Sequence, residues 1–417
     1  MGYTLNQADL DALLQGGAFF GSGGGGTVTS ARNLSKYFKQ GDYYPVDHFE
    51  VVSVEEATDG DTVMVAYMGA PEAIDSTQYP IGPVAAAQQV IDRLKSQDRK
   101  LAYVISPESG ALGFLVAGLV AAKLGLKVID ADGAGRAVPS LPMLTYAAAE
   151  ISPRPTFLVS QGDLCVELNV TPRKDSSEGG KTHQQDVSTI VEQMLRPILA
   201  EQEFNEFGGL AMWVMTSADL PKALPIRGTL SRALQFGRAL IAGELATSSD
   251  VIHYLKKHCH IDAYAITPPA TLASAKVDTT GGFDLGKIQL QHGHDRYTVL
   301  YQNESLMAWN SALPHPIAVA PDSIAYFVEG KGQAVYSNGD LVLDNGQLNP
   351  TVKDRKIVLL AWQADRALTH GLILDSFMTL LASIGYLGPY VPLAKLDDLN
   401  QSHHAPSRVT SGTGVSA

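Results

Sequence analysis

Two acidic side chains and one basic side chain lie close together in the segment 127–143, KVIDADGAGRAVPSLPM. Asp130 and Asp132 come at the end of an apolar run that predicts a β-strand, and Arg136 follows two glycines later. Because residues two apart on a strand point the same way, the two carboxylates could divide acid and base roles or hold a metal ion. The arginine could bind an anionic or carbonyl oxygen. The alternative is turn chemistry, in which one aspartate caps a turn and the other pairs with Arg136.

Two glutamates are further candidates for the same site. Glu108 follows the neighbouring predicted strand, residues 101–106, and ligands of parallel α/β sheets bind beyond the carboxyl ends of strands. Asn303 and Glu304 interrupt an otherwise apolar segment, YQNESLMAWN. Since burying a carboxylate without a partner is costly, Glu304 either faces solvent or belongs to a polar site.

A glycine-rich loop, FFGSGGGGTVTSAR, occupies residues 19–32. It is not a P-loop, because Thr27 stands where the phosphate-binding lysine would be. A dinucleotide fingerprint needs a preceding strand, whereas the pattern predicts a helix capped by Asn6 and ended by Gly16 and Gly17. Exposed backbone N–H groups would suit a carboxylate or a ring carbonyl, and the alternative is a tight turn between two packed helices.

Metal ligands and reactive thiols give weaker signals. His292 and His294, in QHGHDRY, could join Asp130 and Asp132 as ligands of a zinc or manganese ion, but no complete ligand set is visible. The same segment fits a solvated hairpin tip between two alternating strands. Cys165 lies in an apolar run and is expected in the core.

Composition limits the classes of function. The chain has 417 residues, 45% of them hydrophobic, and a formal net charge of −12, which argues against nucleic acid or an anionic membrane as a partner. Two cysteines form no disulfide framework, so a cytoplasmic setting is expected. The longest apolar run, residues 111–124, is shorter than the roughly 20 residues of a membrane span and predicts a buried helix.

The order of predicted elements indicates two domains. Strands and helices alternate from residue 61, which predicts for residues 1–170 an α/β domain with a mostly parallel sheet and covering helices. The polar segment 171–186 is the best boundary. Residues 171–392 should form a β-rich α+β domain, helical at 187–258 and rich in strands at 262–370. Residues 401–417 are expected to be a disordered tail.

Three motifs together resemble the S-methyl-thiohydantoin desulfurase-like family. They are GSGGGG, DADGAGRAVPSLPM, and QNESLMAW followed by APDSI, and the resemblance runs from about Asp9 to Pro392. It implies the same two-domain fold and a role near hydantoin or thiohydantoin catabolism, often beside hydantoinase or oxoprolinase subunits. Gln78 and Tyr79 depart from the family pattern. The positions that match it are Gly23, Gly24, Gly25, Gly26, Asp130, Asp132, Gly133, Arg136, Pro139, Asn303, Glu304 and Asp322.

The expected activity is hydrolytic removal of sulfur from a small cyclic amide or thioamide. Water activation falls to Asp130 or Asp132, anion binding to Arg136, and a second acid or base role to Glu304. A non-catalytic binding subunit that works with a hydantoinase or oxoprolinase-type enzyme, and a cyclic-amide hydrolase, stay open as alternatives, as does a homo-oligomer. The expected substrate-binding residues are Gly23, Gly24, Gly25, Gly26, Glu108, Gly133, Asn303 and Asp322.

Overall fold

A computed structural model describes residues 2–38, 47–69, 81–172, 183–280, 283–330, 332, 334–343 and 346–404. Gln78, Tyr79, most of the polar segment 171–186 and residues 405–417 lie outside this part. The last helix runs to His404, so the expected tail begins inside a helix. Within the described part, no helix combines the length and the apolar character that a membrane crossing needs.

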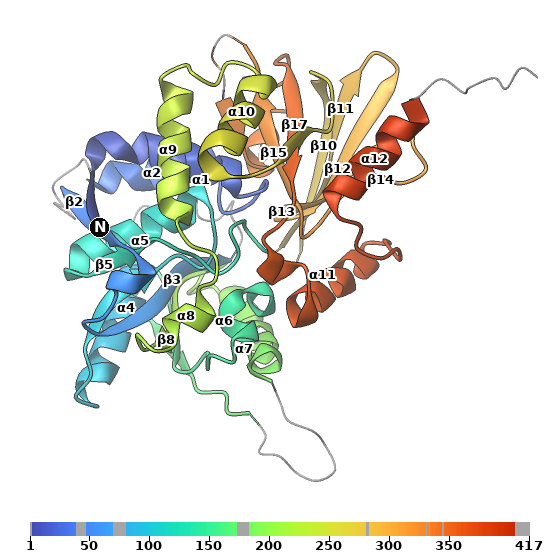
Figure 1. Cartoon of the computed structure of the whole chain (residues 1–417). Helices are drawn as coiled ribbons and strands as arrows, with labels where there is room; N and C mark the ends of the chain where they lie inside the picture. Colours follow the sequence, from blue (N-terminus) through green and yellow to red (C-terminus); the bar gives the residue numbers. More distant parts are fainter. Residues whose placement is uncertain are drawn as a thin grey trace, which may run out of the picture.

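The N-terminal region is built on an eight-stranded mixed sheet (Figure 1). The strand order is β1–β2–β5–β4–β3–β8–β6–β7. Neighbours from β2 to β3 in this order are parallel, and all other neighbours are antiparallel. The strands are β1 Tyr3–Asn6, β2 His48–Val52, β3 Asp61–Gly69, β4 Leu101–Ile105, β5 Lys127–Ile129, β6 Thr156–Val159, β7 Cys165–Leu168 and β8 Phe207–Met215.

Helices cover both faces of this sheet, as the alternation of β3 requires. Val63 and Val65 pack into one core, and Met64, Ala66 and Met68 pack into a second core on the opposite face. The first core includes side chains of α1 Leu10–Phe20, α2 Val28–Ser35, α4 Ile81–Lys95, α5 Ala111–Leu124, α9 Thr229–Ile241 and α10 Ser248–Tyr254. The second includes side chains of α6 Thr145–Ala148, α7 Gln184–Leu199, α8 Leu220–Ala223, α11 Gly371–Ser383 and α12 Leu393–His404.

The C-terminal region contains two antiparallel sheets, as its alternating segments predict. A third core lies between them, formed by buried side chains from both. One sheet comprises β10 Thr271–Thr280, β11 Phe283–His292, β12 Asp295–Gln302, β13 Glu304–Asn310 and β14 Pro316–Val319. The other has the order β16–β15–β17–β9, with β9 Ala263–Ala265, β15 Ser323–Val328, β16 Ala334–Tyr336 and β17 Ile357–Trp362. Short helical turns are η1 Gln7–Asp9, η2 Lys36–Phe38, η3 Val54–Glu56, η4 Leu141–Met143, η5 Leu255–Cys259, η6 Gly339–Leu341 and η7 Arg366–Leu368.

The chain returns to the first sheet after the polar segment 171–186. Strand β8 lies between β3 and β6, although it follows the segment at which the sequence suggests a boundary. The expected division at residue 170 stays a prediction. The eight-stranded sheet therefore contains strands from before and after residue 170.

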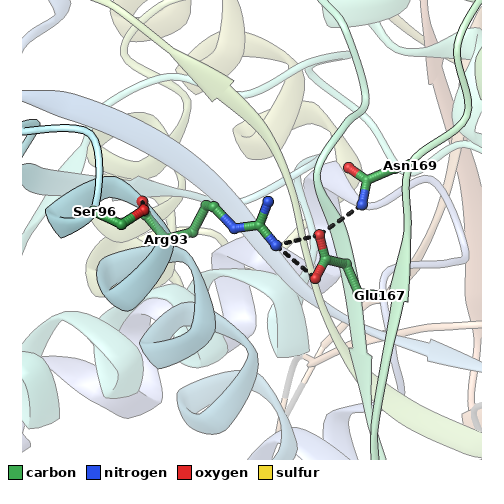
Figure 2. A network of polar contacts seen from close by, with 4 residues as sticks. All are labelled: Arg93, Ser96, Glu167 and Asn169. Carbon is green, nitrogen blue, oxygen red and sulfur yellow. Dashed lines mark hydrogen bonds and ion pairs between the residues drawn. The ribbon is translucent and has the colours of Figure 1, made fainter.

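The edge strand β7 is attached to α4 by surface contacts (Figure 2). Arg93 of α4 donates from Nη2 to both carboxylate oxygens of Glu167, at 2.6 and 2.7 Å, and Asn169 donates to the same carboxylate. Such an exposed pair contributes about 1 kcal/mol at most. The expectation of a core position for Cys165 is wrong, because an edge strand exposes one face and this thiol lies on it.

The first long helix does not end at its glycines. Asn6 caps the η1 turn that leads directly into α1, and α1 continues through Gly16 and Gly17 to Phe20. The reason is the close approach of α9. A Cβ atom on Gly16 would lie 1.8 Å from the Ala233 carbonyl oxygen, and one on Gly237 would lie 1.7 Å from the Ala12 carbonyl oxygen. Gly16 of α1 and Gly237 of α9 let the two helix backbones touch. This contact holds α1, and so positions the glycine loop that follows it.

We expect Gly237→Ala to lower the free energy of unfolding by about 3 kcal/mol, because the added methyl group must push two helix backbones apart. Helix propensity alone gives the opposite sign, since alanine is favoured over glycine inside a helix by about 1 kcal/mol. Denaturant unfolding measures the difference. Gln235→Ala, at an exposed position of the same helix, is the control and should change stability little. A stabilised Gly237→Ala protein would contradict the close packing.

Candidate active site

A cavity of about 160 Å³ lies between the eight-stranded sheet and the five-stranded sheet. It opens beyond the carboxyl ends of β3 and β4, where parallel α/β sheets bind ligands. An engineered protein cavity of roughly 150 Å³ takes up benzene, so this volume suits one small ring. The polar residues that line it are Thr27, Tyr67, Glu108, Ser140, Glu192, Arg196, Asp284, Tyr301, Asn303, Glu304, Ser337 and Asn338.

The glycine loop passes between β13 and the start of α5, and this crossing explains its composition. A Cβ atom on Gly24 would lie 2.3 Å from Glu304 Oε1. One on Gly23 would lie 2.4 Å from Ser305 Oγ, and one on Gly25 would lie 2.5 Å from the Gly110 Cα atom. The loop is therefore a turn between two packed helices that also forms one wall of the cavity, and ligand binding by its N–H groups stays a prediction.

Loop carbonyl groups accept from the protein backbone, whereas several loop N–H groups, including those of Gly25 and Gly26, have no acceptor in the described residues. Carbonyl oxygens of Ser22, Gly23 and Gly25 accept from backbone N–H groups at 2.9, 2.7 and 3.0 Å. Gly25 and Gly26 are partly exposed and line the cavity, and within the described residues their N–H groups have no acceptor. These two amides can donate to a bound molecule.

The start of α2 is already occupied by a protein carboxylate. Asp340 is buried, and its Oδ2 atom accepts from the Val28 N–H group at 3.0 Å. Thr27, whose side chain accepts from Ser30 N, is the N-cap of α2. A ligand at this loop therefore does not bind through the end of the helix.

Glu304 points into the cavity wall from the first position of β13. Asn303 alone joins β12 to β13 and adopts a left-handed φ of 57°, held by its hydrogen bonds with Asp284 and Asn338. The Glu304 side chain is buried, and its Oε2 atom has no hydrogen-bond partner in the described part of the chain. Burial raises the pKa of Glu304 to about 8, against the opposing charge of Arg136.

Glu108 is the second carboxyl group of the cavity. It follows β4, and its Oε2 atom accepts from the Val138 N–H group at 2.7 Å. Burial raises the pKa of Glu108 well above its ordinary value, and repulsion from Glu304 raises it further. Because two such carboxyls cannot both ionise easily, they titrate as a pair that retains a proton. One can then donate a proton while the other accepts one.

The two aspartates after β5 do not line the cavity, which corrects the expected geometry. Strand β5 ends at Ile129, so the alternation that would align Asp130 with Asp132 does not continue. Asp130 Oδ1 accepts from the Leu230 and Ser231 N–H groups, both at 3.0 Å, and so caps α9. The fully buried Asp132 accepts from Ser109 Oγ at 2.6 Å and from two following backbone amides. Turn and cap chemistry is what the structure shows.

Arg136, Gly133 and Asp322 also lie behind the cavity wall. The Arg136 guanidinium is fully buried and donates only to backbone carbonyl groups. The N–H group of Gly133 donates to the Pro107 carbonyl oxygen at 2.8 Å, which ties the two strand-end loops together. Asp322 accepts from Tyr390 Oη and from two backbone amides. The glycine loop and the 130–136 bend are thus close in space. The glycine loop lines the cavity, whereas the bend does not, and the segment that contains it reaches the cavity only from Val138 onward.

Several cavity residues have no signal in the local sequence. Arg196 of α7 forms an ion pair with Glu192 at 2.7 Å, and its guanidinium lies 3.8 Å from the centre of the Phe283 ring. Asn338 binds both the glycine loop and the Asn303 turn, yet SNG in the sequence indicates only a turn. The i, i+4 spacing of Glu192 and Arg196 could have suggested their pair but not its place.

The histidines of the expected metal set lie elsewhere. His294 is at the tip of the β11–β12 hairpin, and His292 Nδ1 lies 2.9 Å from the Pro269 carbonyl oxygen. In the described ranges, no three His, Cys, Asp or Glu side chains are placed to hold a metal ion. The zinc or manganese ion stays a prediction.

Comparison with known proteins identifies the family. Residues 8–169 match the model described as S-Me-THD-like, N-terminal domain, and residues 185–341 match S-Me-THD-like, C-terminal domain. The crystal structure of a protein from Chromobacterium violaceum is 57% identical, with a TM-score of 0.86 over 94% of this chain and 100% of that chain. Curated proteins give no match. The chain therefore belongs to the S-Me-THD-like family.

Proposed function

We propose that this protein is an enzyme that hydrolyses the carbon–sulfur bond of a thiohydantoin or an S-methyl-thiohydantoin-like ring. The observation that supports this most is the Glu108–Glu304 pair, half-buried at Glu108 and buried at Glu304, in a cavity of ring size. The family description agrees with such a substrate. A ring that has lost its sulfur keeps its shape, so the cavity has to serve both substrate and product.

The chemistry needs one acid and one base. The ring carbon that carries sulfur lies between two nitrogens. The ionised carboxyl accepts a proton from water as the water oxygen bonds to that carbon, and the protonated carboxyl donates to a ring nitrogen. The carbon–sulfur bond then breaks, the thiol leaves with a proton, and the new oxygen becomes a carbonyl. One water is consumed, one hydantoin and one thiol are formed, and nothing is oxidised. Positioned acid–base groups contribute factors of about 10²–10⁴ to such a rate.

The remaining walls would hold the ring. The free N–H groups of Gly25 and Gly26 can donate to a ring carbonyl oxygen, on which negative charge grows during water addition. Met64, Met68 and Leu112 supply apolar and polarisable contacts on another side. In this proposal Asp130, Asp132 and Arg136 keep no direct contact with the ring, and the base is a member of the glutamate pair.

We expect Glu304→Gln and Glu108→Gln each to lower kcat/KM by about 10²–10⁴, since either change removes one member of the acid–base pair. The assay is thiol release from S-methyl-thiohydantoin, with the ring product identified so that ring opening is distinguished from sulfur loss. Asp130→Asn is the control, because it removes a helix cap outside the cavity. If Asp130→Asn abolished turnover in a folded protein while Glu304→Gln did not, the assignment of the pair would be wrong.

The raised pKa also predicts how stability depends on pH. An unfolded glutamate ionises near pH 4.5, whereas Glu304 in the folded protein keeps its proton to about pH 8. Between these values the folded state binds more protons, so rising pH lowers the free energy of unfolding by up to about 1.4 kcal/mol per pH unit. Glu304→Gln should remove this loss and be more stable than the wild type at pH 8 but not at pH 5.

Thermal unfolding from pH 5 to pH 9 measures this difference between wild type and Glu304→Gln. Glu167→Gln, which changes a surface carboxylate paired with Arg93, is the matched control and should follow the wild-type curve. Parallel curves for wild type and Glu304→Gln would show that the Glu304 carboxyl is ionised throughout.

A further inference from the structure

Arg136 is a buried cation without a directly bonded carboxylate. Its Nε atom donates to the Ala137 carbonyl oxygen, and Nη2 donates to that of Ser305, both at 2.9 Å. Nη1 donates to the carbonyl oxygens of Pro321 and Asp322, both at 2.8 Å. Within the described residues it has no ion pair. All of its hydrogen-bond partners are thus neutral dipoles.

A cation in this position needs negative charge nearby. Burying an ion costs several kcal/mol, and removing the compensating charge leaves the other partner strongly destabilised. Burial lowers the pKa of Arg136 to about 10, so the side chain stays charged at neutral pH. The carboxyl groups that oppose this shift are Glu304, Asp322 and Glu108, in that order. Two of these three belong to the cavity.

The contacts of Arg136 lead to both members of the pair. Ser305, whose carbonyl oxygen it binds, is the residue after Glu304. Ala137, whose carbonyl oxygen it also binds, precedes Val138, and the Val138 N–H group donates to Glu108. The guanidinium therefore binds the backbone next to Glu304 and the segment that donates to the Glu108 carboxylate, from behind the wall that the substrate would touch.

We infer that Arg136 is a positioning residue that sets how many protons the Glu108–Glu304 pair carries, without contacting the substrate. Its role in turnover rests on the proposed function, whereas its effect on protonation does not. Loss of the cation makes ionisation of the pair harder, so the pair retains its proton to higher pH.

Other charged groups face the same pair and must be considered. Arg196 of α7 lowers the pKa of Glu304 and Asp284 of β11 raises it, while Asp132 raises the pKa of Glu108. Arg196 is already paired with Glu192, which offsets its charge. Arg136 is the larger of the two cationic influences on Glu304.

The test compares Arg136→Lys, Arg136→Met and Tyr390→Phe with the wild type. Tyr390→Phe loosens the same 321–322 segment, by removing a hydrogen bond to Asp322, but leaves the cation in place. The first readout is the pH at which thermal stability stops falling. We expect Arg136→Met to move this pH upward by about 1–3 units, because an opposite charge nearby shifts a carboxyl pKa by that much. Arg136→Lys and Tyr390→Phe should move it little.

The second readout is the acid limb of the kcat/KM profile, which should move upward in Arg136→Met and stay in Tyr390→Phe. A protein with lower stability but an unmoved pH dependence would overturn the inference, because a purely structural arginine predicts that result. If Arg136→Met turned over the substrate with an unchanged kcat/KM profile against pH, the inference about Arg136 would be wrong, and the proposed function would be unaffected. If the wild type shows no turnover, the proposed function fails and the stability readout alone decides.

Arg136→Met could also fail to fold. The double variant Arg136→Met/Glu304→Gln then provides the measurement, since it removes both charges and should recover folded protein. Recovery supports the inference. Failure of the double variant to fold shows that Arg136 serves only to join backbone segments, which overturns the inference.

Discussion

The contact between the backbone of Gly24 and the carboxyl group of Glu304 is the constraint on which the site depends. It joins residues 280 positions apart, and no side chain larger than hydrogen fits between them. The glycines let the loop meet β13, α5 and the η6 turn at once, and the loop carbonyls accept from the backbone there. The cavity is therefore formed by the packing of the two regions against each other, and neither region alone contains the Glu108–Glu304 pair.

Placing the two carboxyl groups in this cavity lowers the free energy of unfolding. Glu108 and Glu304 would each be more stable ionised in water, and the fold instead holds them in a site where burial favours the protonated form. The hydrogen-bonded elements around them have to be stable enough to offset that cost. Asp132, Asp322 and Asp340 supply this support, since each accepts several hydrogen bonds, at least one of them from a distant segment. The acidic side chains of this protein thus fall into two groups. The three aspartates accept several hydrogen bonds each and support the fold, whereas Glu108 and Glu304 accept fewer and face the cavity.

Much of the fold follows from local sequence patterns. The buried helix 111–124 has the predicted bounds, and the β-rich region lies where the alternation places it. The end of α1 could not be predicted, because Gly16 is helical only where α9 touches it. The sequence places both aspartates at the site only if β5 continues to residue 132, whereas β5 ends at Ile129. A strand end followed by a helix cap uses the same residue types, and only the distant partners, Leu230 and Ser231, distinguish the two.

The charged side chains of the motif DADGAGRAVPSLPM do not line the cavity, although its residues 138–141 do. Asp132, Gly133 and Arg136 act on the protein itself: they bind the loop that carries Glu108 and the strand that begins with Glu304. A segment under such tight geometric demands tolerates few residue types, so a distinctive motif is what a scaffold of this kind requires. The cavity residues face fewer constraints from their neighbours in sequence, and Arg196 and Asn338 accordingly leave no local signal. Sequence motifs here locate Glu304 and the support of the site, whereas Arg196 and Asn338 are found only from the cavity that this support encloses.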